Sequence, residues 1–120
     1  METFSNPSTL PLPMDTNDCV RYVDFSKIIL IDSESRKTHV YVKDEEPILS
    51  SINITDLEAM LPPEFFFRCH RCQIIGLRHL KKFEKKTRVL TLADNYSAIV
   101  AEDLVKNFLD RTNPRRKKKK

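Results

Sequence analysis

Residues 61–77, LPPEFFFRCHRCQIIGL, decide the fold of this chain. Pro62-Pro63 end any helix that precedes them, because proline lacks the backbone N–H and its ring clashes with the preceding turn. Two short runs follow, at 65–72 and 73–77, and short runs of this kind are typical of strands rather than of long helices. The segment therefore predicts a helix that stops at the prolines and an extended chain beyond them.

Three short runs rich in β-branched and aromatic residues lie upstream. Residues of these types favour strands. We expect strands at 27–31, 38–43 and 48–54. The first two are joined by a turn at Asp32-Ser33-Glu34-Ser35, and a charged turn across 43–47 leads to the third.

A short helix is predicted next, between these strands and the prolines. Thr55-Asp56-Leu57-Glu58 is a capping-box sequence, in which the Thr hydroxyl accepts from the N–H three residues on and the Glu reaches back. Leu57, Met60 and Leu61 then fall on one face. The helix has room for only about two turns before the prolines.

Downstream, the same pattern of short runs continues. We expect further strands at 80–83, 88–92 and 96–100, with turns at 84–87 and 94–95. A final helix begins near Ala101. Its apolar stripe consists of Leu104, Val105, Phe108 and Leu109, and Asn113-Pro114 ends it. The sequence thus predicts a mainly β domain with short helices.

The length of 120 residues leaves room for one folding unit. We divide it into an irregular N-terminal lead (1–19), a domain (20–112) and a disordered polybasic tail (113–120). The chain has 21 basic and 17 acidic residues, and six of the basic ones lie at 115–120, which leaves 15 against 17, or −2. No run is long enough to cross a membrane and no export signal is visible, so we expect a cytoplasmic protein with no membrane partner.

Several kinds of chemistry are disfavoured. A single glycine cannot build a dinucleotide fingerprint or a P-loop. Cys69 and Cys72 form one Cys-x-x-Cys, but the third thiol, Cys19, lies far upstream, and a dyad of Cys72 with His70 lacks a Gly-rich turn for an oxyanion hole. We expect no enzyme activity, no cofactor and no metal, and a zinc-stabilised module stays open as an alternative.

Two basic clusters remain to be explained. Arg36-Lys37 lies beside His39, and Arg68, His70, Arg71 and Arg78 follow the phenylalanine run. Arginine pairs with guanine edges and phosphate oxygens, so clusters that meet on one face would suit a duplex. Charge alone does not separate this interpretation from simple solvated cations.

The order of elements resembles the LytTR family of DNA-binding domains. Residues 61–77 are similar to the family signature, in which a short helix is followed by Phe-x-Arg-x-His-Arg-Ser. The strand at 27–32 and the segment from Leu90 to Val100 with the closing helix resemble the family's flanks, so the resemblance spans about 20–111. It implies an elongated, antiparallel LytTR-like β domain whose loops enter successive major grooves of DNA.

The resemblance also implies contact residues. The turn and strand start after the first family strand correspond to Lys37, Thr38 and His39, and the position after the motif His corresponds to Arg71. His70 is a further candidate. Arg68 is expected to be structural, held by an internal carboxylate.

The implied function is sequence-specific binding of double-stranded DNA by a bacterial transcriptional regulator. Family members often carry the receiver domain of two-component systems, and we expect this chain to act without one, as a homodimer on repeated half-sites or under a regulatory partner protein. The alternative is a degenerate LytTR-like fold that acts as a protein-interaction module. Glu102 where the family has Arg, Gly76 where it has Asn, and the −2 charge favour that alternative.

Overall fold

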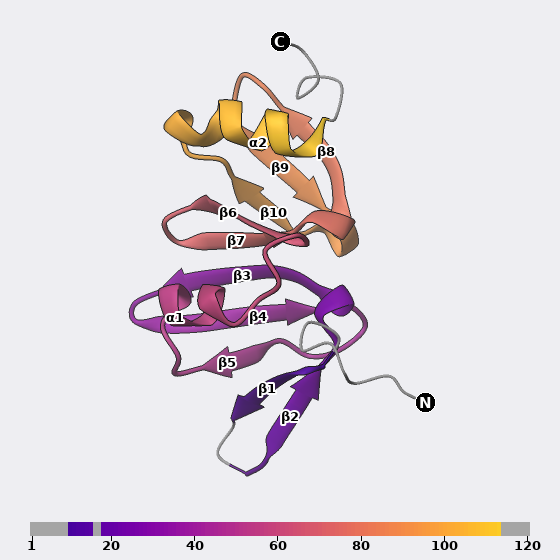
Figure 1. Cartoon of the computed structure of the whole chain (residues 1–120), viewed down its shortest axis with the longest axis vertical. Helices are drawn as coiled ribbons and strands as arrows, with labels where there is room; N and C mark the ends of the chain where they lie inside the picture. The colour runs from indigo at the N-terminus through magenta and orange to yellow at the C-terminus, as the bar shows by residue number, and fades with distance from the viewer. Residues whose placement is uncertain (1–9, 16–17, 114–120) are drawn as a thin grey trace.

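The computed structural model describes residues 10–15 and 18–113. Its middle layer is a five-stranded sheet in the order β5-β4-β3-β7-β6, and all of its neighbouring strands are antiparallel (Figure 1). These strands are β3 (Ile28–Glu34), β4 (Lys37–Val42), β5 (Ile48–Ser50), β6 (Phe66–His70) and β7 (Gln73–Gly76). The prediction of a mainly β antiparallel domain is confirmed.

Smaller units lie on either side of this sheet. In Figure 1, helix α2 (Val105–Thr112) lies across a three-stranded sheet at the top, and helix α1 (Ile54–Ala59) lies in front of β3 and β4. The three-stranded sheet has β8 (Leu80–Glu84), β9 (Val89–Leu92) and β10 (Ser97–Ile99), and a lower hairpin has β1 (Leu12–Asp15) and β2 (Val20–Val23). Short 3₁₀ turns are η2 (Phe25–Lys27), η3 (Leu77–His79), η4 (Ala93–Asn95) and η5 (Glu102–Leu104).

The central strand β3 is buried on both of its faces. Ile28 and Ile31 join a cluster with the β1–β2 hairpin and α1, while Ile29 and Leu30 join a second cluster with β9, β10 and α2. A register irregularity between Ile28 and Leu30 accompanies this arrangement. The sequence of a strand that is covered on both faces is a continuous apolar run rather than an alternation of apolar and polar residues. This is why 28–31 is uninterrupted Ile-Ile-Leu-Ile.

The first helix begins two residues earlier than its capping box predicts. Asn53 is the N-cap, and its side-chain oxygen accepts from the backbone N–H of Asp56 at 2.8 Å. Asn53 Nδ2 also donates to Asp56 Oδ2 at 3.0 Å. This frame buries Ile54 and Leu57, and the helix ends at Ala59, before the prolines. The prediction of Thr55 as N-cap was wrong because Asn is as good a cap as Thr.

Other boundaries also differ from the sequence prediction, among them the strand expected at 48–54, which ends at Ser50. Residues 12–15 of the supposed irregular lead form β1, whose alternation buries Leu12 and Met14 and leaves Pro13 exposed on an edge strand that tolerates it. Strand β3 continues to Glu34, and the turn to β4 is Ser35-Arg36 rather than 32–35. The predicted tail beyond Asn113 and residues 1–9 of the lead lie outside the described residues.

Candidate nucleic-acid interface

Three turns from distant parts of the sequence meet at one edge of the molecule. The backbone N–H of Ser33, next to the β3–β4 turn, donates to the carbonyl of Cys72 in the β6–β7 turn at 2.8 Å. Ala101, which precedes η5, donates to the carbonyl of Cys69 at 2.8 Å. Figure 1 shows all three turns along the left side. The fold therefore brings Arg36 and Lys37 of the first basic cluster and Arg71 of the second to a common edge, whereas Arg78 lies on η3, beyond the far end of β7.

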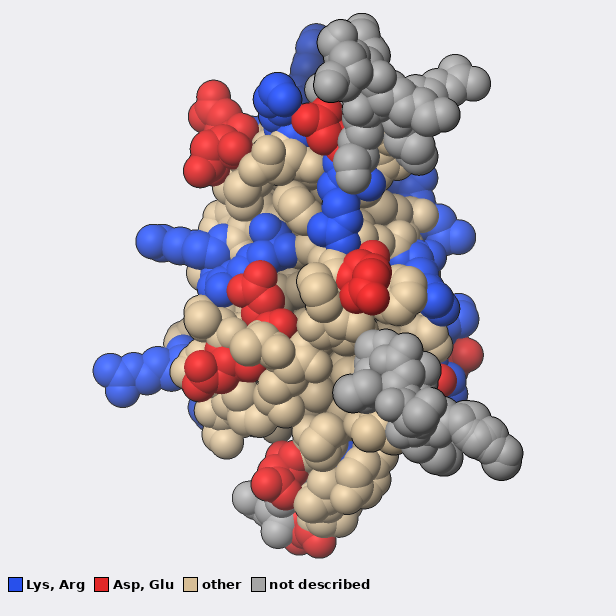
Figure 2. Space-filling view, in the orientation of Figure 1, with Lys and Arg blue, Asp and Glu red and all other residues tan. Residues whose placement is uncertain are grey.

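Three cations at this edge are not neutralised. Arg36, Lys37 and Arg71 are exposed, and none forms an ion pair within the part of the chain that the structure describes. Blue side chains project from this side in the space-filling view (Figure 2). Glu102 and Asp103 are also exposed here, at the start of η5. The edge thus presents free cations on the two hairpin turns and acids on the third.

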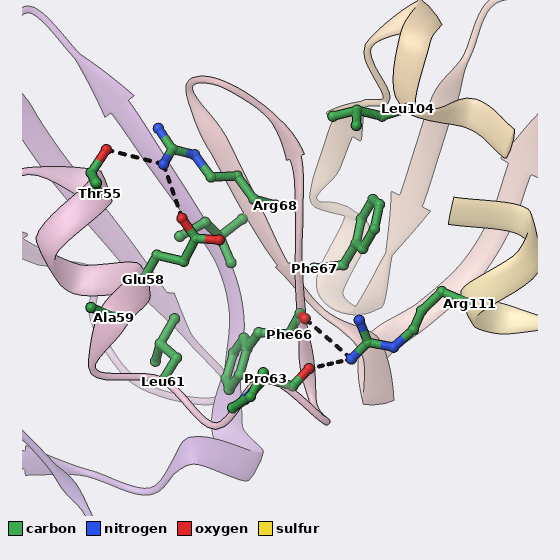
Figure 3. A pocket seen from close by; sticks show the side chains of 11 residues that line it. Thr55, Glu58, Ala59, Leu61, Pro63, Phe66, Phe67, Arg68, Leu104 and Arg111 are labelled. Atoms are coloured by element: carbon green, nitrogen blue, oxygen red, sulfur yellow. Dashed lines mark hydrogen bonds and ion pairs between the residues drawn. The ribbon is translucent and has the colours of Figure 1, made fainter. Parts of the chain in front are cut away.

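Arg68 holds the β6–β7 turn in place. Its Nη1 donates to Glu58 Oε1 and to Thr55 Oγ1, both at 3.0 Å, which ties β6 to α1 (Figure 3). Its Nη2 donates to the carbonyl of Arg71 at 2.5 Å. The prediction that Arg68 is structural and held by a carboxylate is confirmed. Arg68 therefore fixes the backbone at Arg71, three residues later, and leaves the Arg71 side chain free.

His70 shapes the same turn from the other side. Its Nδ1 accepts from the backbone N–H of Cys72 at 3.2 Å. An imidazole that accepts at Nδ1 carries its proton on Nε2, so a donor remains at this half-buried ring. His70 and Gln73 flank the two-residue turn, with a register irregularity on the β6 side. Arg71 is consequently at the tip of a tight hairpin.

The candidates on β4 have different surroundings. The Thr38 side chain is fully buried, and its hydroxyl donates to the carbonyl of Ile52 at 2.8 Å. Thr38 was wrong as a contact residue, because strand alternation turns it into the core while Lys37 and His39 face outward. His39 is half buried and stacks on Tyr41 with ring centroids 6.2 Å apart. Its Nδ1 has no hydrogen-bond partner in the described structure.

Asp32 lies under this edge, opposite His39 on one side and Gln73 on the other. Burial is the main cause that raises the pKa of its carboxyl, and a side-chain hydrogen bond with Gln73 acts in the opposite direction. Among the weaker charge effects, Glu34 raises this pKa, and both His39 and His70 lower it. The sheet therefore disfavours a negative charge at Asp32.

The cysteines show no reactive arrangement. Cys69 is fully buried, and burial raises the pKa of its thiol to about 12. A thiol with so high a pKa is a poor nucleophile near neutral pH. Among the described residues, no three His, Cys, Asp or Glu side chains are grouped to hold a metal ion. None of the described helices is long and apolar enough to cross a bilayer.

Gly76 has a packing role away from the edge. It ends β7, at the opposite end from the β6–β7 turn. A Cβ built on it would lie 2.3 Å from the carbonyl oxygen of Ile28, closer than any real side chain comes. The absence of Asn at this position therefore reflects the close approach of β3 and does not argue against DNA binding.

Two residues of this edge and of its support were not among the candidates from the sequence. Arg36 is at the tip of the β3–β4 turn with a φ of 68°, beside the candidate Lys37. Its position next to Lys37 in a hairpin turn was the sequence signal that could have identified it. Glu58 is the carboxylate that holds Arg68, but its place in the apparent capping box concealed that role.

Comparisons with known proteins show the family to which this fold belongs. The family model described as the LytTr DNA-binding domain matches residues 18–113. The transcriptional regulatory protein YpdB of Escherichia coli CFT073 is 30% identical over 115 residues, which cover 84% of this chain and 46% of that protein. The CO-responsive transcriptional regulator RcoM of Rhodospirillum rubrum is 25% identical over 93 residues, which cover 71% of this chain and 39% of that protein. The chain thus spans less than half the length of these curated relatives.

A solved structure shares the fold. It is the LytTr DNA-binding domain of a protein described as a methyl-accepting/DNA response regulator from Bacillus cereus, with a TM-score of 0.76 at 23% identity. The match covers 87% of this chain and 97% of that one. The family model, the relatives and the fold agree with the resemblance seen in residues 61–77, and the chain belongs to the LytTR family of DNA-binding domains.

Proposed function

We propose that this protein is a transcriptional regulator that binds double-stranded DNA sequence-specifically through the edge formed by its three turns. The observation that carries the proposal is the meeting of Arg36, Lys37 and Arg71 on two adjacent hairpin turns without carboxylate partners in the described structure. A cation without an internal partner is available to phosphate oxygens or base edges. The tie from Arg68 to the Arg71 backbone supports a preformed turn.

Each cation has a distinct role in the proposal. Arg71, at the tip of the β6–β7 hairpin, enters the major groove, where a guanidinium forms two hydrogen bonds with a guanine edge. Arg36 and Lys37 contact phosphates on the flank, which fixes position without reading sequence. His39 and His70 are further candidate donors: His70 ends β6 next to Arg71, and His39 lies on β4 two residues after Lys37.

The proposed assembly is two copies on repeated half-sites in the bacterial cytoplasm. The family match supports the DNA partner. Because the chain spans less than half the length of its curated relatives, the source of the signal is also a proposal: a regulatory partner protein or a change in abundance.

The decisive test is Arg71→Ala measured on a duplex selected from a random pool. We expect an affinity loss of about 1–3 kcal/mol and weaker discrimination between bases at one position. The melting temperature should not change, because the substitution breaks no ion pair within the described residues. Fluorescence anisotropy at two salt concentrations gives the affinity.

Arg78→Ala is the matched control. Arg78 is an exposed arginine on η3, beyond the opposite end of β7, where its guanidinium lies 4.4 Å from the ring centroid of Phe65. We expect at most a small affinity loss from this variant. Equal losses for both arginines, or none for Arg71→Ala, would show that this edge does not read DNA.

A protein-interaction module is the second candidate, and exposed Glu102 and Asp103 at the same edge favour it. In that case, selection from random duplexes enriches no sequence. A partner recovered from lysate should then lose affinity with Glu102→Ala. An enriched duplex consensus rules against this candidate.

A further inference from the structure

A groove separate from the exposed turns lies between α1, β6 and α2. Its volume is about 650 Å³, within the range of small-molecule sites in proteins. Figure 3 shows apolar walls that converge from the three elements. The apolar lining comes from Ala59, Leu61, Pro63, Phe66, Phe67, Ile74 and Leu104. The groove therefore offers a site for an apolar group of modest size.

The charges that line the groove do not cancel. Arg68 and Glu58 form an ion pair at 3.0 Å at one end, so that end is neutral. Arg111 is at the other end, where it donates to the backbone carbonyls of Pro63 and Phe66 (Figure 3). Within the described residues Arg111 has no carboxylate partner, since its neighbour Asp110 pairs with Lys106 at 3.1 Å. One positive charge thus remains at the mouth of an apolar groove.

We propose that this groove binds a small organic monocarboxylic acid with an aromatic or short aliphatic body, its carboxylate on Arg111 and its apolar body against Phe66, Phe67 and Leu104. An uncharged apolar ligand would leave the arginine unneutralised, and a bare inorganic anion would leave the apolar walls in water. The backbone carbonyls of Pro63 and Phe66 both accept from Nη2 of Arg111, so Nη1 remains a donor for a charge-assisted hydrogen bond to a carboxylate. The charged residues at both ends favour a compact ligand over an extended chain.

The site connects to the DNA edge through one side chain. Arg68 lines the groove and also donates to the carbonyl of Arg71. A ligand packed beside Arg68 changes the freedom of the β6–β7 turn. Regulation of DNA affinity by such an acid is a consequence that rests on the proposed function, whereas binding of the acid does not.

The test is a titration of the ¹⁵N-labelled full chain, without DNA, followed by NMR. The probes are phenylacetate and octanoate, each compared with its neutral amide, and with acetate and inorganic phosphate. We expect saturable shifts at Leu61, Phe67 and Leu104, a smaller shift at Arg71, and dissociation constants in the millimolar range or tighter. At least one acid should bind about tenfold more tightly than its amide, because the amide lacks the charge.

Two variants and a control assign the site. Arg111→Gln should remove the preference for the acid over the amide. Ala59→Trp fills the groove from an exposed helix position and should abolish binding of acid and amide alike, which keeps the test valid if Arg111→Gln fails to fold. Lys81→Gln removes an exposed cation of β8 that does not line the groove and should leave binding unchanged.

Several results would overturn the proposal. They are the absence of saturation up to about 10 mM acid, equal binding of acid and amide, or shifts centred on Arg36, Lys37 and Arg71, which would indicate nonspecific anion binding. Because the titration contains no DNA, failure of the DNA proposal leaves its outcome unchanged.

Discussion

Arg68 joins three parts of the molecule with one side chain. It is 23% exposed and donates to a carboxylate, a hydroxyl and a carbonyl. We expect Arg68→Gln to lower the free energy of unfolding by about 1–3 kcal/mol, since it breaks hydrogen bonds of a charged, mostly buried group. Glu58→Gln should cost about 0.5 kcal/mol or less, because that carboxylate is largely exposed to water. Urea unfolding measures both.

Lys82→Gln provides the comparison for this prediction. It breaks the exposed Lys82–Glu84 pair at 3.4 Å and should have almost no effect on unfolding. If Arg68→Gln costs as little as Lys82→Gln, then the guanidinium does not anchor the turn.

The raised pKa of Asp32 predicts that the stability of the fold depends on pH. Burial raises the pKa of its carboxyl in the folded protein, so the folded state holds this proton at pH values where the unfolded chain has released it. The free energy of unfolding therefore falls as the pH rises from the pKa of this carboxyl in the unfolded chain, near 4, to its higher pKa in the folded protein. Above the folded pKa, the loss of stability stays constant. Asp32→Asn should be more stable than the parent at pH 7 and equal to it near pH 3.

Urea unfolding of the two proteins at both pH values checks this prediction. Glu34→Gln, on the exposed end of the same strand, is the control and should show a smaller gain at pH 7. A loss of stability in Asp32→Asn at pH 7 would mean that the charge itself is favourable there.

Among the elements, the β3–β4 turn has the least favourable backbone. Ser35 and Arg36 have φ values of 53° and 68°, the left-handed pair of a type I′ hairpin turn. Asn-Gly is the preferred pair for this turn, and a left-handed conformation costs other residues about 1–2 kcal/mol each. The double variant Ser35→Asn with Arg36→Gly should raise stability by about 1–2 kcal/mol and weaken DNA binding, because it removes a cation from the proposed interface.

Thermal melting and duplex anisotropy of this variant separate the two effects. Arg36→Asn keeps a residue that tolerates the left-handed region and removes only the charge. A double variant that melts no higher than the parent would contradict the assigned strain, and unchanged affinity would remove Arg36 from the interface.

The elements also show what the sequence can reveal. The runs at 28–31, 38–42 and 89–92 and the stripe of the last helix were recognised, because buried segments of β-branched or periodic apolar residues leave a strong local pattern. Strand β1 was missed, since a proline in its middle and another just before it conceal an alternation that only its pairing with β2 makes visible.

The candidate site could be predicted from the sequence only in part. Arg68 and Arg71 stand in a dense, unusual segment, so the sequence could suggest a structural role for Arg68, which the hydrogen bonds confirm, and a DNA contact for Arg71, which stays a prediction. The burial of Thr38 and the exposure of Arg36 depend on the register of β4 against β3, which a one-residue shift would change. Such a shift reverses which side chains face the core. No local pattern in the sequence specifies it.

At the scale of the whole molecule, the structure spans 47 × 38 × 25 Å, with the proposed interface along one edge. The described body has mixed charge, whereas residues 115–120 carry six cations. We expect removal of 115–120 to weaken binding to all duplexes about equally. The slope of the salt dependence should fall by about 0.9 for each phosphate that the shortened protein no longer neutralises.

Anisotropy titrations of selected and scrambled duplexes across a salt series measure this. The ratio of the two affinities should not change on truncation, because the cations of a polybasic segment attract phosphates without reading bases. A truncated protein that loses discrimination would place base readout in that segment.

The three turns of the proposed interface come from residues near 35, 71 and 102, and the last of them is followed by the helix that seals the second core with Phe108. Pairings between segments so far apart in the chain form late in folding. A chain that ends before this helix carries Arg71 and the pairing of β3 with β7, but it lacks the third turn and the Phe108 side chain of the second core. Under the proposed function, we therefore expect such incomplete chains to compete poorly with the full chain for an operator.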